Sequence, residues 1–252
     1  MVVAVKLMQN TLLDDKTEFL ILRSPSQSTN QLDDVNLRIG SSLIAPSPNA
    51  RNLGVIFDSG LTFHDHISKV VSLGFFHLRS IASIKKYLPI DSLTTLVHAF
   101  ITSRIDFCNS ILYGLPSREI QRIQRLQNQA ARLLTNTRRW EHITPILSKL
   151  HWLPVNKRIH FKILTFAHKA VNQTGPAYLH LPQHIQLRST RSSTAPMLHM
   201  QIGRKKCAGD RAYRVAAPKL WNAVPAIIRM CQDLPKFQSN IKTILFQEAF
   251  GQ

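Results

Sequence analysis

Arginine residues recur at helical spacing between positions 117 and 139. At 100° per residue, one narrow sector of such a helix holds Arg118, Arg122, Arg125, Gln129 and Arg132. A second sector, more than a quarter-turn away, is apolar and can pack on a core: Ile123, Leu126, Ala130, Leu133 and Leu134. Guanidinium groups offer fork-shaped donors that suit phosphate oxygens. The first sector, which we call the arginine stripe, therefore predicts contact with a phosphate backbone.

Acidic partners are scarce around the arginine stripe, since Glu119 is the only carboxylate between Asp106 and Glu141. Arg138 and Arg139 follow directly and extend the predicted nucleic-acid-binding set. Contacts of this kind would be independent of sequence and sensitive to salt. The alternative interpretation is an ordinary solvated helix face.

Other residues with chemical potential lack the patterns that a metal or catalytic site requires. The aspartate pairs 14–15 and 33–34 and the eleven histidines are the candidate ligands. His64 and His66 flank Asp65, and His180 and His184 have Pro182 between them, but neither pair has a Cys or carboxylate set at metal-site spacing. No Gly-x-Gly-x-x-Gly, P-loop or Gly-x-Ser-x-Gly motif occurs. We expect no metal, no cofactor and no small-molecule substrate.

The charge of the chain is concentrated in its second part. The whole chain has 32 Lys and Arg against 14 Asp and Glu, a net charge of +18. Residues 1–103 hold 9 basic and 8 acidic residues, whereas residues 104–252 hold 23 basic and 6 acidic ones. So basic a region favours a polyanion, nucleic acid first and an anionic membrane surface second, with basicity that serves no specific partner as a third interpretation. The triplet 204–206 (Arg-Lys-Lys) is a weaker candidate, either for nuclear entry or for phosphate contact.

Cellular location is predicted from what the sequence lacks. The three cysteines are far apart, and no signal-peptide pattern opens the chain. No run of about 18 apolar residues is present, so we expect no membrane. These features predict an intracellular protein, nuclear or cytoplasmic, that is not secreted.

Elements that would position these residues follow from periodicity and turn residues. Strands are expected at 17–22 and 52–57, and a hairpin at 35–45. Helices are expected at 63–87, about 91–107, 117–136, 143–150, 155–171, 217–230 and 234–250. Asp91 or Ser92, and Ser117, are the predicted helix caps. The fold class is therefore α+β. We also expect a strand at 197–202 and a polar loop at 188–196. Packing in the core or between helices is expected for Trp140, Trp152 and Trp221.

Several segments, in this order, resemble a known family. Segment 12–20 (Leu-Leu-Asp-Asp-Lys-Thr-Glu-Phe-Leu) is similar to Leu-Asn-x-x-Lys-Thr-Glu-x-Leu late in the palm of LINE-type (non-LTR) retrotransposon reverse transcriptases, with Asp14 where Asn is usual. Further similar segments lie at 52–58, 61–67, 100–109, 127–132, 142–145, 150–155 and 217–225. The order and spacing resemble the jockey-like clades of these elements.

The resemblance implies a truncated palm with a primer-grip strand at 1–62, a helical thumb-like domain at 63–185 and a basic C-terminal region at 186–252. Leu53, Gly54 and Val55 would belong to the primer grip, and Lys16 matches the family's general-acid lysine. Without the metal ions Lys16 would have nothing to act on, and a surface lysine beside a strand is the preferred interpretation. The Tyr-x-Asp-Asp turn that helps hold two Mg ions is absent, so the chain alone would not be a polymerase. The implied partner is an RNA–DNA hybrid, or another nucleic acid backbone.

Two other interpretations stay open. The chain can be a transposon-derived open reading frame without a function, or a helical interaction module domesticated by a host. Segment 61–87 is also similar to a segment at the N-terminus of an AlkB-type tRNA-modifying protein, but the His-x-Asp of an oxygenase is missing, so no oxygenase activity is implied.

Overall fold

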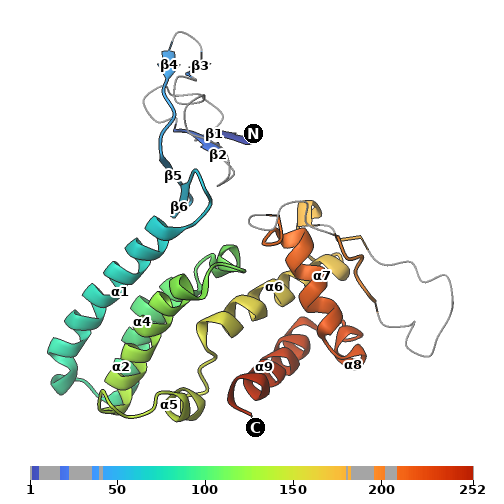
Figure 1. The fold of residues 1–252 in the computed structure, drawn as a ribbon. Helices are drawn as coiled ribbons and strands as arrows, with labels where there is room; N and C mark the ends of the chain where they lie inside the picture. Colours follow the sequence, from blue (N-terminus) through green and yellow to red (C-terminus); the bar gives the residue numbers. More distant parts are fainter. Residues whose placement is uncertain are drawn as a thin grey trace. The chain divides into compact units, whose positions relative to one another are not determined.

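The computed structural model describes residues 2–5, 18–22, 36–39, 42–179, 181–182, 196–201 and 209–251. In these residues the chain combines long helices with short antiparallel strand pairs, which confirms the α+β class. The chain divides into two compact units, Met1–Ser72 and Leu73–Gln252. The first holds the strands and the second holds most of the helices (Figure 1).

Three antiparallel strand pairs are present in the described part of the first unit. They are β1 (Val2–Val5) with β2 (Phe19–Leu22), β3 (Leu37–Ile39) with β4 (Ser42–Ile44), and β5 (Asn49–Asn52) with β6 (Val55–Asp58). β2 confirms the strand expected near 17–22, and its Phe19, Leu20 and Ile21 are buried. The β3–β4 pair confirms the hairpin expected at 35–45.

The single strand expected at 52–57 is wrong, because the chain turns back within it. Asn52 pairs with Val55, so Leu53 and Gly54 form a two-residue hairpin loop. Both have positive φ, 45° and 87°, as the loops favoured in two-residue hairpins require. Leucine is unusual at such a position, and its side chain is 87% exposed. Of the three residues assigned to a primer-grip strand, Leu53 and Gly54 thus form a turn, and Val55 is the buried first residue of β6.

The second unit is helical. Its elements, with α1 starting in the first unit, are α1 (His64–Ile84), η3 (Lys85–Tyr87), α2 (Ile90–Val97), η4 (His98–Thr102), α3 (Ser103–Asp106), η5 (Asn109–Leu112), α4 (Ser117–Thr135), α5 (Thr144–Lys149), α6 (Val155–Val171), η6 (Ala177–Leu179), α7 (Tyr213–Ala223), α8 (Ala226–Arg229) and α9 (Leu234–Phe250). The helices expected at 155–171 and 234–250 are confirmed to the residue.

Three details of the helical prediction are corrected. Pro89 and Pro116 occupy the N-cap positions of α2 and α4, so Asp91, Ser92 and Ser117 lie inside the helices and do not cap them. The helix expected at 91–107 contains a five-residue π-helical stretch, η4. The helix expected at 217–230 is interrupted after Ala223, at Val224 and Pro225, because proline donates no backbone hydrogen bond.

Segment 196–201 is docked on α7 and does not form the expected strand. Leu198 makes an isolated bridge and exchanges two hydrogen bonds with the side chain of Asn222: its N–H donates to Oδ1 (3.0 Å), and its carbonyl accepts from Nδ2 (2.9 Å). The side-chain amide of Asn222 thus satisfies both backbone groups of Leu198, as a paired strand would do. Position 202 and the polar loop at 188–195 lie outside the described ranges.

The core of the second unit is built around α6, which packs against α4, α7 and α9. Phe237 of α9 is fully buried, with its ring 4.3 Å from that of His168 and 5.6 Å from that of Trp221. Elsewhere, α1 approaches α4 at Gly74, where a side-chain methyl group would overlap Leu126. The arginine-bearing helix α4 is thereby packed between α1 on one side and α5 and α6 on the other.

Candidate nucleic-acid interface

Helix α4 buries the predicted apolar sector except for half-buried Leu133, and it exposes part of the arginine stripe. Ile123, Leu126 and Ala130 have essentially no exposure, as the periodicity predicted. Arg118 is 85% exposed, and Arg125 is also exposed. Arg125 has no hydrogen bond or ion pair within the described part of the chain. These two guanidinium groups have donors available for an incoming anion.

Arg122 has a different environment, although its spacing placed it with the others. Its Nη1 lies 2.8 Å from Oε2 of Glu119, whose side chain is only 7% exposed. Arg118 also approaches Glu119, at 3.5 Å. A buried carboxylate requires such a cationic partner. Arg122 therefore neutralises Glu119 as well as adding charge to the surface.

Arg132 fixes the turn that follows α4. Its Nη2 donates to the carbonyl of Glu141 at 2.6 Å, and its Nη1 donates to the carbonyl of Arg138. The N–H of Arg138 donates to Oε1 of Glu141 (2.8 Å), and the N–H of Glu141 donates back to the carbonyl of Arg138 (3.2 Å). We call residues 138–141 the Arg138–Glu141 turn. Its ends are held together, and Arg139 and Trp140 form its tip.

Trp140 was expected to pack inside the protein, and this is wrong: its side chain is 76% exposed. Arg138 lies over its ring, with Cζ 5.4 Å from the centroid, and Arg139 is exposed beside it. Trp152 and Trp221 are buried, as expected. The sequence neighbours of Trp140 could have predicted its exposure. Two arginines and a glutamate flank it, and the apolar periodicity of α4 ends before it.

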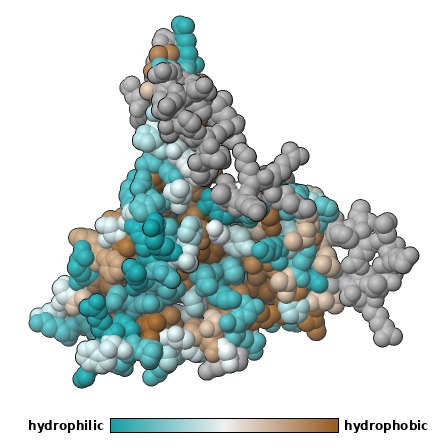
Figure 2. Space-filling view, viewed as in Figure 1, coloured by the Kyte–Doolittle hydropathy of each residue, from teal (hydrophilic) through white to brown (hydrophobic). Residues whose placement is uncertain are grey.

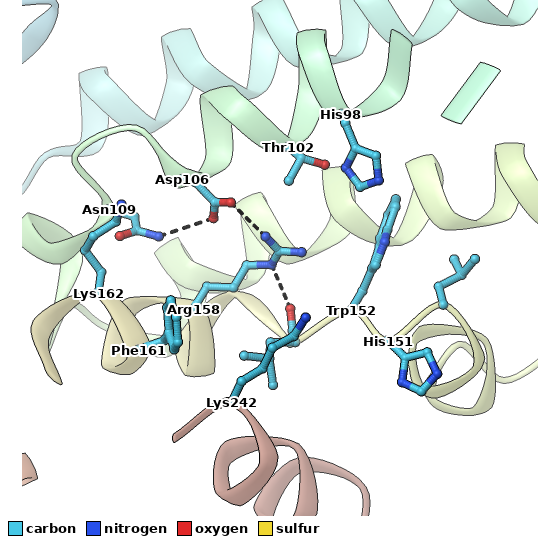
Figure 3. Close-up of a pocket in the computed structure, with 12 residues that line it drawn as sticks. His98, Thr102, Asp106, Asn109, His151, Trp152, Arg158, Phe161, Lys162 and Lys242 are labelled. Atoms are coloured by element: carbon cyan, nitrogen blue, oxygen red, sulfur yellow. Dashed lines mark hydrogen bonds and ion pairs between the residues drawn. The ribbon is translucent and has the colours of Figure 1, made fainter. Parts of the chain in front are cut away.

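A cleft of about 470 Å³ lies between the η4–α3 segment, the loop before α6, and helices α6 and α9 (Figure 3). Within it, Nη1 of Arg158 lies 2.8 Å from Oδ2 of Asp106, and Nε of Arg158 donates to the carbonyl of Leu153 at 2.9 Å. Oδ1 of Asp106 accepts from Asn109 at 3.4 Å. From α4, Gln127 donates to the same Leu153 carbonyl at 2.9 Å.

This polar network joins three of the segments that carry the family resemblance, 100–109, 127–132 and 150–155. Segments far apart in the sequence thus meet through hydrogen bonds that hold the loop before α6. Asp106, Asn109 and Gln127 were not singled out as individual functional residues. Their role in the structure is to position α3, α4 and α6 relative to one another.

Basic side chains line part of the cleft. Lys162 of α6 and Lys242 of α9 line it, together with His98, whose ring lies 5.5 Å from that of Trp152 (Figure 3). Asp106 is the one carboxylate among its lining residues and is paired with Arg158. Nowhere in the described ranges do three or more His, Cys, Asp or Glu side chains gather as metal ligands. These side chains suit an anionic group better than a cation.

The other predicted residues either fall outside the described ranges or belong to the first unit. Lys16, the aspartate pairs 14–15 and 33–34, His180, His184 and the triplet 204–206 fall outside the described residues. Leu53, Gly54 and Val55 belong to the first unit. His66 is buried there and accepts from the N–H of Ile56 at 3.5 Å; burial, and to a lesser extent Lys69, lowers its pKa.

Helix α1 carries exposed apolar side chains, including Leu73, Phe76 and Ile84. Hydrophobic patches lie among hydrophilic residues over the face of the chain seen in Figure 2. By length and composition alone, the stretch His64–Tyr87 is apolar enough to cross a membrane, although core helices of soluble proteins pass the same test. This stretch was not expected from the sequence, because polar and charged residues interrupt the apolar run. The absence of a membrane partner stays a prediction.

Comparison of the chain with protein-family models, with curated proteins and with solved structures gives no match.

Proposed function

We propose that the helical unit binds the sugar–phosphate backbone of nucleic acid, with an RNA–DNA hybrid as its original partner. The observation that carries the proposal is the combination of charge and exposure on α4. Residues 104–252 hold 23 basic and 6 acidic residues, and Arg118 and Arg125 are exposed on the surface of that region. Guanidinium groups of this kind pair with phosphate oxygens without reading the bases.

The packing of α4 supports this assignment. Its opposite face is fixed by buried Ile123, Leu126 and Ala130, so the exposed arginines project from a rigid helix. Arg122 and Arg132 are held by Glu119 and by the Arg138–Glu141 turn, and each keeps part of its surface open to solvent. Lys162 and Lys242 add positive charge at the cleft in the same unit. The exposed guanidinium groups are thus carried by a helix that is already packed on its neighbours.

The second part of the proposal concerns origin and activity. The ordered segments that resemble LINE-type reverse transcriptases support descent from the end of the palm and the thumb of such an enzyme. Two Mg ions would supply the chemistry of that enzyme. The ligands that the family uses are absent from this sequence, and the described residues offer no replacement cluster. We therefore assign binding, in the nucleus or cytoplasm, and no polymerase activity to this chain alone.

A salt-titrated binding assay on an RNA–DNA hybrid tests the proposal. The variant Arg118→Gln plus Arg125→Gln removes two exposed guanidinium groups, keeps the closer Arg122–Glu119 ion pair and places no new carboxylate beside Glu119. Loss of two phosphate contacts should lower the slope of log K against log salt by about 2 and weaken binding to all sequences alike. Arg122→Glu is avoided, because it would place two carboxylates together at a partly buried site.

The matched control is Lys219→Gln plus Lys236→Gln, which changes the net charge equally at exposed positions of α7 and α9. Its effect on the slope should be clearly smaller. Equal effects of the two double variants would show that net charge, and not α4, governs binding. No binding at low salt would refute the proposal and leave the interpretations of an unused open reading frame or a host interaction module.

A further inference from the structure

We infer that the Arg138–Glu141 turn is a stacking platform for an unpaired nucleobase, so that the chain holds single-stranded nucleic acid beside the backbone contacts of α4. The inference rests on the proposed function and adds the kind of strand recognised. Trp140 at the tip of the turn is 76% exposed, the largest exposure of any described tryptophan. An indole left in water exposes a large apolar ring, which a base can cover.

The turn is held in place before any ligand arrives. Arg132 donates to the carbonyls at both ends of the turn, those of Arg138 and Glu141. The Glu141 side chain accepts from the N–H of Arg138 at 2.8 Å. Asn136, with φ of 55°, ends α4 in the left-handed conformation and directs the chain into the turn. A base that stacks on Trp140 therefore meets a backbone that is already ordered, which reduces the entropy lost on binding.

The charges around the ring match a nucleotide. Arg138 covers one side of the indole at 5.4 Å, which leaves the rest of this exposed ring for a second planar group. Arg139 is exposed at the tip and has no hydrogen bond or ion pair within the described residues. A base on Trp140 would thus have a cation next to its phosphate. Aromatic side chains with neighbouring arginines are the usual means of holding single strands without reading their sequence.

Nucleic acid is favoured over a protein partner by charge. Tryptophan and arginine also occur in the centres of protein interfaces, so the charge around the ring decides between the two kinds of partner. Around Trp140 the exposed neighbours are Arg138, Arg139, Glu141 and His142, and the region beyond residue 103 has a large excess of basic residues. This environment suits a polyanion that presents flat, apolar bases.

The experiment uses the full chain, a short oligo(dT) and a blunt RNA–DNA hybrid of the same length. Trp140→Ala should weaken oligo(dT) binding about ten-fold, which corresponds to the loss of one stacked base. Binding of the blunt hybrid should change less than about two-fold, because paired bases are not available for stacking. Trp140→Phe should retain most of the oligo(dT) affinity, since phenylalanine keeps an aromatic face.

Tryptophan fluorescence gives an independent reading. Trp152 and Trp221 are 6% and 0% exposed, so quenching by an added oligonucleotide should come from Trp140. The quenching should be absent from Trp140→Phe, although that variant still binds. The substitutions are at an exposed position, and an unchanged circular dichroism spectrum would show that the fold is kept.

Two failures can be told apart. If neither oligo(dT) nor the hybrid binds at low salt, the proposed function itself fails. If both bind and Trp140→Ala leaves oligo(dT) affinity unchanged, the stacking inference alone is wrong. Equal weakening of both ligands by Trp140→Ala would also overturn it, because the contact would then not depend on unpaired bases.

Discussion

Replacing Gly74 with alanine separates two opposite expectations for helix α1. Alanine is about 1 kcal/mol more favourable than glycine in an exposed helix interior, so helix propensity alone predicts a more stable protein. In the structure, a Cβ on Gly74 overlaps Cδ2 of Leu126 and lies 3.0 Å from Cδ1 and 3.2 Å from Cγ. Leu126 is fully buried, so its side chain has little room to move away. We therefore expect the clash to outweigh the gain in propensity.

The magnitude follows from these two contributions. Overpacking of a closely packed core costs about 1–3 kcal/mol. After the gain in propensity of about 1 kcal/mol, Gly74→Ala should lower the free energy of unfolding by about 1 kcal/mol. Leu126→Ala alone should cost about 2–5 kcal/mol, because it leaves a cavity. In the double variant the new methyl group occupies part of that cavity, so the combined loss should fall short of the sum by about 1 kcal/mol.

The assay is denaturant unfolding of the full chain, followed by the helical circular dichroism signal. Ser83→Ala is the control, because Ser83 is exposed in the same helix and its change should stay within about 0.5 kcal/mol. A Gly74→Ala protein more stable than the parent would refute the close approach of α1 and α4. Strict additivity in the double variant would refute the direct contact between positions 74 and 126.

Two further predictions concern the site and the core. Arg132→Gln removes the guanidinium donors that hold the Arg138–Glu141 turn, so trypsin should cleave after Arg138 and Arg139 faster than in the parent protein. The control Arg125→Gln should leave those cleavage rates unchanged. Cleavage of Arg132→Gln at the parent's rate would contradict the role of Arg132. Burial lowers the pKa of His168 below 6.5, against smaller opposite effects of the Cys231 carbonyl and Asp233, so folding favours the neutral ring. The stability that neutral His168 contributes should be complete above about pH 6.5 and lost as the pH falls. His168→Gln should therefore flatten the pH dependence of the unfolding midpoint between pH 7 and 5. An unchanged pH dependence in this variant would contradict the lowered pKa of His168.

Periodicity predicted the long helices well, because each buries one continuous face. Helix α4 confirms this, since Ile123, Leu126 and Ala130 are buried as their spacing indicated. Periodicity could not reveal what lies at the ends of elements. Pro89 and Pro116 start helices that nearby Asp and Ser residues were expected to cap, because proline already has the backbone angle that a helix start needs.

The same limit applies to the candidate site. Spacing treated Arg118, Arg122, Arg125 and Arg132 as equivalent, since all lie in one sector of the helix. In the structure, Arg122 is held by Glu119 from the first turn of α4, and Arg132 is held by the turn that follows the helix. The other two arginines are exposed. Leu53 shows a similar limit in the prediction of strands. A leucine side chain does not indicate a turn, and the turn follows only from the pairing of β5 with β6.

The packing of α6 has a consequence for how the protein is made. Its buried face, with Ile159, Ile163 and Ala167, is covered mainly by α7 and α9, which are synthesised later. At about 5–20 residues per second, the chain needs roughly 4–16 s to extend from Val171 to Phe250. During that interval α6 can pack on the earlier helix α4, but the part of its apolar face that α7 and α9 cover stays open to aggregation and to capture by chaperones. A ribosome stalled before α9 would therefore hold an incomplete core that lacks the buried Phe237, Ile241 and Leu245.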